Sequence, residues 1–150
     1  MKNIIDIYPN NILDLNLVVM TSPNIKDIQD KYTRSNGDPI EDTFLDNYPG
    51  LATILRDKEA EDIVLVIVLN YIPDYVKKRS EFEQICYMIN TIGHEAFHIL
   101  MDTLDVIEDK LVSEAQEFPA YYIGWIVECA YRTWTKSNDT FQKRTKTKGQ

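Results

Sequence analysis

A chain of 150 residues, 44% hydrophobic and 27% charged, has the size and composition of one globular domain. No stretch approaches the roughly 18 apolar residues of a membrane span, and the N-terminus lacks the features of a signal peptide, so we expect a cytoplasmic protein without a membrane partner. The net charge of −8 argues against sequence-independent nucleic-acid binding, which needs a basic surface. Only two cysteines occur, Cys86 and Cys129, and without a CxxC pair they exclude a disulfide scaffold and indicate reduced core thiols.

The first half of the chain predicts a strand, a short helix and a loop. Residues 13–21 alternate and then become continuously apolar, which is typical of a strand. Ser22 and Pro23 predict a helix start, with serine as N-cap and proline at the first helical position, and this helix extends to about Tyr32. Residues 35–50 combine turn residues with acids and predict a long surface loop.

The second half predicts a hairpin followed by two helices. Residues 51–56 and 63–70 form the hairpin, and the second strand is apolar on both faces, so we expect it to be covered on both sides. A helical period holds from about residue 80 to 104, and a second pattern runs from Ser113 or Phe118 to Trp134. The predicted apolar stripe of the first helix consists of Phe82, Ile85, Ile89, Ile92, Ala96, Ile99 and Thr103.

Together these elements predict an α+β fold in which a short, mostly antiparallel sheet packs on a central helix, with a second helix at the C-terminal end. We expect one domain over residues 1–135 and a basic, flexible tail over residues 136–150. The tail carries five basic residues and one acid, so it could contact nucleic acid weakly, although a solvated tail is the commoner case.

The central helix contains the sequence His94-Glu95-Ala96-Phe97-His98, an HExxH motif that uses both histidines of the chain. Residues four apart on a helix differ by only about 40° around its axis, so both imidazoles project from one face and can bind one ion. That face lies opposite the apolar stripe and should open to a cleft. Glu95 is placed beside it, where its carboxylate can reach a metal-bound water without being a ligand.

Two histidines leave a zinc ion short of ligands, because catalytic sites usually supply a third protein ligand. A third histidine on the metzincin pattern is excluded, since Leu104 and Met101 occupy the positions of its histidine and glycine. The remaining common solution is a glutamate from a following helix. Glu117 is the main candidate, and Glu114 and Glu128 are the alternatives.

His94, Glu95 and His98 followed by Glu117 resemble the glutamate-type zincins, the thermolysin-like group of metallopeptidases. The HEAFH motif with a downstream glutamate and the Ala120-Tyr121 pair is also similar to small zincin-like proteins of bacteriophages and prophages. The resemblance covers about residues 51–134. It implies a Zn²⁺-dependent metallopeptidase with a zincin-like fold, in the cytoplasm of a bacterial cell or phage host. Its substrate would be a peptide or protein, such as a regulatory protein.

The mechanism that this implies is hydrolysis by a zinc-activated water. His94, His98 and Glu117 hold the zinc, and Glu95 accepts the water's proton and delivers it to the leaving amine. Tyr121, one turn after Glu117, is the main candidate for stabilising the oxyanion, and the neighbouring Tyr122 is the other.

Asp102 and Asp105 lie close to the histidine face, where they either hydrogen-bond the ligating imidazoles or remain exposed acids. An extended substrate is expected to add to one strand of the hairpin as a new edge.

Two other functions fit the same residues. The first is a catalytically inactive zincin-fold module that holds a structural metal and binds a partner protein. The second is a metal-free interaction protein whose histidines are incidental. An open zinc position beside Glu95 and a strand edge would favour the enzyme, whereas a closed four-ligand site would favour a structural role. The sequence does not specify the oligomeric state.

Overall fold

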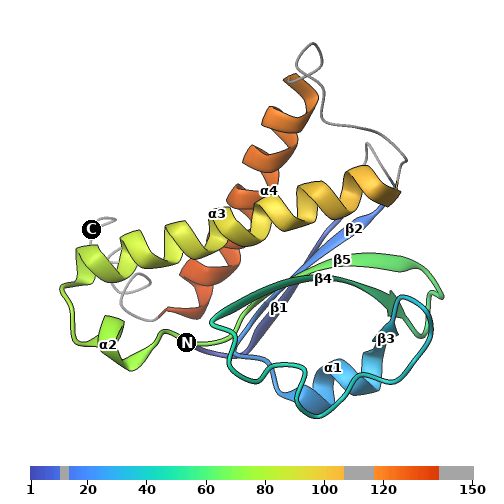
Figure 1. Ribbon diagram of the computed structural model, residues 1–150, viewed down its shortest axis with the longest axis horizontal. Helices are drawn as coiled ribbons and strands as arrows, with labels where there is room; N and C mark the ends of the chain where they lie inside the picture. The colour runs from blue at the N-terminus through green and yellow to red at the C-terminus, as the bar shows by residue number, and fades with distance from the viewer. Residues whose placement is uncertain (11–13, 107–116, 139–150) are drawn as a thin grey trace, which may run out of the picture.

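The computed structural model describes residues 1–10, 14–106 and 117–138, and of Glu117 the backbone alone. Five strands form a single sheet in the order β1-β2-β5-β4-β3 (Figure 1). The strands are β1 (Ile4–Tyr8), β2 (Asn16–Thr21), β3 (Tyr32–Arg34), β4 (Gly50–Asp57) and β5 (Ile63–Leu69). The helices are α1 (Ile25–Lys31), α2 (Asp74–Lys77), α3 (Glu81–Val106) and α4 (Glu117–Ser137).

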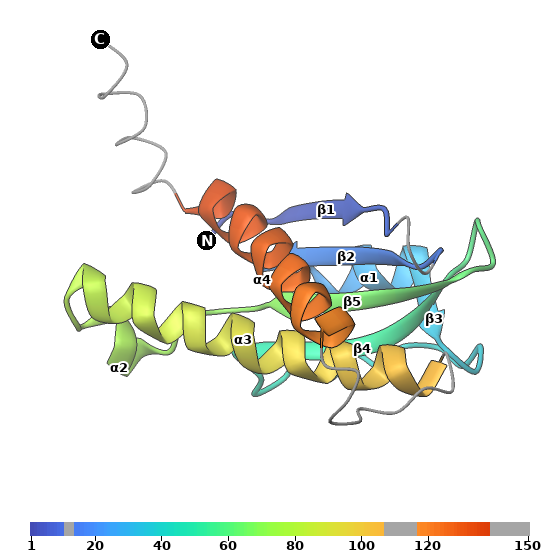
Figure 2. The same ribbon diagram turned by 90° about the horizontal axis from the view of Figure 1, so that it is seen from above.

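The central strand, β5, runs parallel to its neighbour β2, and the other three neighbouring pairs are antiparallel. The predicted α+β class and the mostly antiparallel sheet are therefore confirmed. Helices α3 and α4 lie on one face of the sheet, and α1 lies on the other (Figures 1 and 2).

Strand β5 is covered on both faces, as its sequence predicts. Its alternate residues Leu65, Ile67 and Leu69 are fully buried in the core beneath α3 and α4. The residues between them belong to a second core on the α1 face of the sheet. The predicted hairpin is also confirmed, because β4 pairs antiparallel with β5 along its length.

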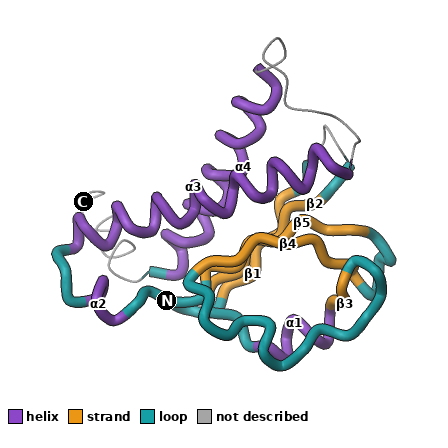
Figure 3. Tube along the Cα trace, in the orientation of Figure 1, coloured by secondary structure: helices purple, strands orange, loops and turns teal. Residues whose placement is uncertain are grey.

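The connection between β3 and β4 is a loop, as expected, but not all of it is surface. Ile40 and Phe44 are buried against the second core together with Ile28 of α1. This segment passes over the face of the sheet that α3 and α4 leave open (Figure 3). Its two apolar side chains explain why a polar stretch of chain follows the sheet so closely.

The start of α1 differs from the prediction. Asn24, not Ser22, caps the helix, because its side chain accepts a hydrogen bond from the N–H of Lys26. Ser22 instead has a positive φ of 43° and donates its hydroxyl to the carbonyl of Asn70. Strand β1 has no counterpart among the predicted elements.

Helix α3 carries the HExxH motif and begins after a capping box. The Ser80 hydroxyl donates to the Glu83 carboxylate at 2.6 Å and accepts from the Glu83 N–H. From Met88 onward the buried residues of the helix lie along the predicted stripe and its flanks: Met88, Ile92, Glu95, Ala96, Ile99, Leu100, Thr103 and Leu104.

The stripe prediction is wrong at its N-terminal end. Phe82 is 73% exposed and Ile89 is 48% exposed. Figure 2 shows that α4 crosses the middle of α3, and that the first turns of α3 extend beyond the crossing. Leu100 and Leu104 lie on the same flank of α3 as Phe82 and Ile89. They are buried, whereas the two earlier residues are exposed.

Helix α4 begins at Glu117 and continues one turn beyond the predicted end at Trp134. The alternative start at Ser113, and the tail after Asn138, lie outside the described residues. Cys129 on α4 is buried, but Cys86 on α3 is exposed, so the prediction of two core thiols is wrong for Cys86. None of the helices described is long and apolar enough to cross a membrane.

Candidate functional site

The two histidines of the motif project together from α3. Their Nε2 atoms lie 3.1 Å apart, the ring centroids 4.7 Å apart, and both side chains are exposed. Two zinc–nitrogen bonds of about 2.0–2.1 Å at a tetrahedral angle separate the two nitrogens by about 3.3 Å. The donor pair therefore fits a single zinc ion with little adjustment.

The same distance also fits a hydrogen bond between two neutral imidazoles, so the pair by itself does not distinguish a metal site from a metal-free one. A third ligand beside the two histidines would distinguish a metal site from a metal-free pair. Within the described residues, no group of three His, Cys, Asp or Glu side chains is arranged to hold a metal.

The predicted third ligands divide into two groups. Glu117 is the first residue of α4, but its side chain lies outside the described part, as does the whole of Glu114. The third candidate, Glu128, is exposed on α4 and forms an ion pair with Arg132 one turn later. Glu117 and Glu114 therefore remain predictions, and Glu128 is engaged elsewhere.

Glu95 differs from the histidines in being buried, with 7% of its surface exposed. Its carboxylate lies beside the backbone N–H of Ala52 in β4, close enough for this group to favour the charged form. Burial raises its pKa above the ordinary range for glutamate, and the two neighbouring histidines and the Ala52 N–H only partly oppose this effect. A carboxyl group held in this way has the raised proton affinity that a general base needs.

A hollow of about 260 Å³ lies between α3 and the beginning of β4. From α3 it is lined by both histidines of the motif, by Glu95 and by Asp102, and from the other side by Tyr48, Gly50, Leu51 and Ala52. The expectation that the histidine face opens to a cleft is thus met. Tyr48 is a site residue that the sequence analysis did not find, and its only sequence signal is its position two residues before the strand.

The edge of β4 beside this hollow is unpaired. Strand β3 pairs only with residues 55–57 of β4, and no other described strand pairs with the preceding residues on that side. The Ala52 N–H faces away from β5, toward Glu95. Because hydrogen-bonding directions alternate along an antiparallel strand, the backbone groups of Gly50 and Ile54 face the same way.

Asp102 lies in the hollow and is partly buried. Burial raises its pKa, the nearby His98 lowers it, and Asp105 raises it again. Asp102 is therefore close enough to His98 for their charges to interact, which fits the predicted role of orienting that imidazole. Asp105 is exposed.

The two predicted tyrosines occupy different environments on α4. Tyr121 is 77% exposed and is not among the residues that line the hollow, so its oxyanion role remains a prediction. Tyr122 is buried, and its hydroxyl contacts the Asn10 amide at 3.1 Å and the Thr103 hydroxyl at 3.4 Å. Tyr122 therefore has a structural role.

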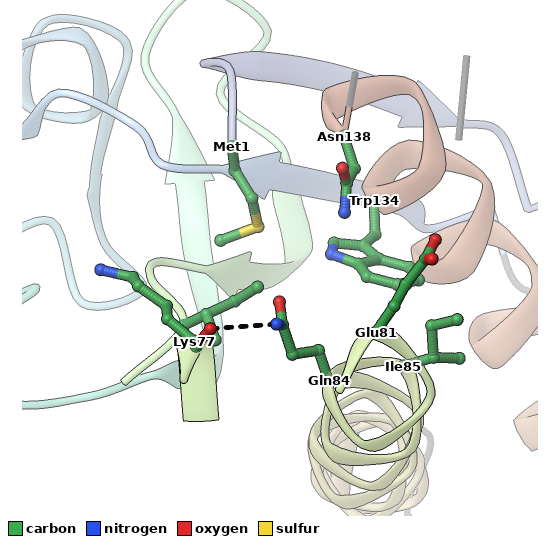
Figure 4. Close-up of a pocket in the computed structure, with 8 residues that line it drawn as sticks. Met1, Lys77, Glu81, Gln84, Ile85, Trp134 and Asn138 are labelled. Carbon is green, nitrogen blue, oxygen red and sulfur yellow. Dashed lines mark hydrogen bonds between the residues drawn. The ribbon is translucent and has the colours of Figure 1, made fainter. Parts of the chain in front are cut away.

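A larger hollow, of about 380 Å³, lies between α2, the start of α3 and the end of α4, with Met1 and Trp134 among its walls (Figure 4). The amide of Gln84 donates to the carbonyls of Lys77 and Arg79 there, so this side chain is already used to join α2 to α3. The hollow contains neither histidine, and we assign the candidate chemistry to the smaller one.

No protein-family model, no curated protein and no solved structure matches this chain. The function of the protein is therefore inferred from its own residues and their geometry.

Proposed function

We propose that the protein is a zinc-dependent metallopeptidase related to the glutamate-type zincins, with His94, His98 and Glu117 as its metal ligands. The observation that carries the proposal is the pair of Nε2 atoms 3.1 Å apart, next to a buried glutamate and an open strand edge. These three features occur together in one hollow.

Each feature has a role in hydrolysis of a peptide bond. The histidines hold the metal, which when bound supplies Lewis acidity at the scissile carbonyl. Glu95 takes the proton from the attacking water and returns it to the leaving amine. The unpaired edge of β4 receives the substrate as an added strand, so that main-chain hydrogen bonds align it along the hollow.

The proposed substrate is a peptide or a protein segment in an extended conformation, such as part of a regulatory protein. We place the activity in the cytoplasm of a bacterial cell or phage host. The two free cysteines support a reducing compartment.

The second candidate is a zincin-like module that binds metal and a partner protein without hydrolysing it. The observation that favours it is that Tyr121 is 77% exposed and is not among the residues that line the hollow. An enzyme of this kind usually needs a donor for the oxyanion, and removing one such donor costs about 10²–10³-fold in rate.

The deciding experiment measures zinc content and hydrolysis of fluorescein-labelled casein by the full chain, alongside Glu95→Gln. We expect one zinc per chain in both proteins and a loss of about 10²–10⁴-fold in hydrolysis for the variant, because only the general base is removed. Zinc binding without hydrolysis by the parent would favour the binding module. Equal hydrolysis by both proteins would refute the mechanism.

A further inference from the structure

Gly50 begins β4 and lies against Thr91 and Glu95 of α3. A Cβ atom added to it would lie 2.8 Å from Oε1 and 3.1 Å from Cγ of Glu95, and 2.7 Å from Cγ2 of Thr91. Real Cβ atoms essentially never have neighbours closer than 3.0 Å. Gly50 does not have a positive φ, since Gly37 is the only glycine with a positive φ in the described part of the chain. The glycine at residue 50 therefore provides space and not backbone freedom.

Both neighbours are restrained by other contacts. The Thr91 hydroxyl donates to the carbonyl of Tyr87 at 3.1 Å, which fixes the side chain with its methyl group against the strand. The Glu95 carboxylate is buried beside the backbone N–H of Ala52, two residues after Gly50 on the same strand. The strand thus supplies the surface against which the carboxylate lies.

Two other glycines provide a direct contrast. A Cβ atom added to Gly93, next to His94 on α3, or to Gly124 on α4 would meet nothing within 4 Å. Of these three glycines, Gly50 is therefore the one at which a side chain would clash with its neighbours.

We propose that Gly50 is a positioning residue for Glu95: the absence of a side chain at residue 50 lets the carboxylate lie against β4, where the Ala52 N–H orients it toward the histidine pair. This inference rests on the proposed function for its catalytic meaning. A methyl group at residue 50 has to displace the carboxylate or separate β4 from α3. A displacement of about 1 Å at a reacting group can cost about 10²-fold in rate.

The test compares Gly50→Ala, the control Gly93→Ala, and the double variant Gly50→Ala/Thr91→Ser, which removes the threonine methyl and keeps the hydroxyl. We expect the double variant to retain its zinc but to lose about 100-fold in casein hydrolysis, in kcat and not in KM. Gly93→Ala should hydrolyse casein at the parental rate. Parental hydrolysis by the double variant would overturn the proposal, because Gly50 would then only accommodate Thr91.

A second measurement needs no activity. Gly50→Ala is made in the parent and in a Glu95→Ala background, and the two shifts in melting temperature are compared. We expect the smaller shift without the Glu95 side chain, since residues in contact are not additive. Equal shifts would refute the contact. A parent that does not hydrolyse casein would refute the proposed function, and the cycle would still decide whether Gly50 sets the position of Glu95.

Discussion

The Nε2 atoms of His94 and His98 lie 3.1 Å apart on α3, close to the separation at which two imidazoles share a tetrahedral ion. Both rings are exposed and take no part in the core, so their substitution should affect the apo protein little, within about 0.5 kcal/mol. The substitutions should lower the free energy of unfolding appreciably only when metal is present. Metal binding and stability can therefore be separated at this site.

The first prediction concerns His94→Ala and His98→Ala. Each should lose tight zinc binding, whereas Asn90→Ala, an exposed change one turn earlier on α3, should bind one zinc per chain. At zinc concentrations 100 times the Kd, the parent should gain about 2.7 kcal/mol of unfolding free energy, and the histidine variants should gain much less. Denaturant titrations with and without chelator measure this difference. If chelation leaves the parent unchanged, the histidine pair is a hydrogen bond and not a metal site.

The second prediction identifies the third ligand. Glu117→Gln should weaken zinc binding by more than about 100-fold, since changes in residues that only support a ligand already cost 10–100-fold. Glu114→Gln and Glu128→Gln should bind zinc as the parent does, and Glu128 is the matched control because it pairs with Arg132. Isothermal titration with zinc compares the three. A loss confined to Glu114→Gln would move the ligand to that residue.

Much of the fold follows from local sequence patterns. The β-branched run of β5, the hairpin with β4 and the period of α3 are visible in the sequence because each depends on neighbouring residues. The exposure of Phe82 and Ile89 is not visible, since it depends on where α4 crosses α3. Strand β1 has no clear sequence signal, because it is short and its apolar residues Ile5 and Ile7 are exposed at the edge of the sheet.

The candidate site shows the same division. The histidine face follows from the spacing of the motif, because it depends only on helical geometry. The burial of Glu95 and the unpaired edge at Ala52 depend on how β4 meets α3, residues some 40 positions apart in sequence. The sequence of either segment alone does not predict how closely β4 approaches α3. Gly50 does not stand out either, because a glycine near the start of a strand is an ordinary turn signal.

The third prediction separates the two neighbouring tyrosines. Tyr122→Phe should lower the unfolding free energy by about 1–2 kcal/mol, because it removes the hydroxyl that contacts Asn10 and Thr103 in the interior. Tyr121→Phe should leave stability unchanged, since this side chain is 77% exposed. Urea unfolding measures both. Casein hydrolysis by Tyr121→Phe then tests its proposed oxyanion role, and an unchanged rate would remove Tyr121 from the site.

The fourth prediction concerns acid stability and the attachment of β1 to α4. Asp6 on β1 accepts hydrogen bonds from Thr133 at 2.8 Å and from Lys136 at 2.7 Å, and Tyr8 donates to the same carboxylate. Burial alone would raise the pKa of Asp6, but these three donors outweigh it and lower the pKa below its ordinary value. The pKa of Lys136 is raised, mainly by its hydrogen bond to Asp6.

The lowered pKa of Asp6 fixes the sign of the effect. Its contribution to stability is present above the unfolded-state pKa of about 3.9 and is lost as the pH falls through the lower folded-state value. Asp6→Asn should therefore cost about 1 kcal/mol at pH 7, since Lys136 is half exposed, and less at pH 2, because the parent's carboxylate takes up its proton as the pH falls. Glu128→Gln, which breaks an exposed pair on the same helix, should cost less than half as much at pH 7. Urea midpoints at the two pH values measure these differences, and a cost for Asp6→Asn that is equal at pH 7 and pH 2 would show that the carboxylate charge does not hold β1 to α4.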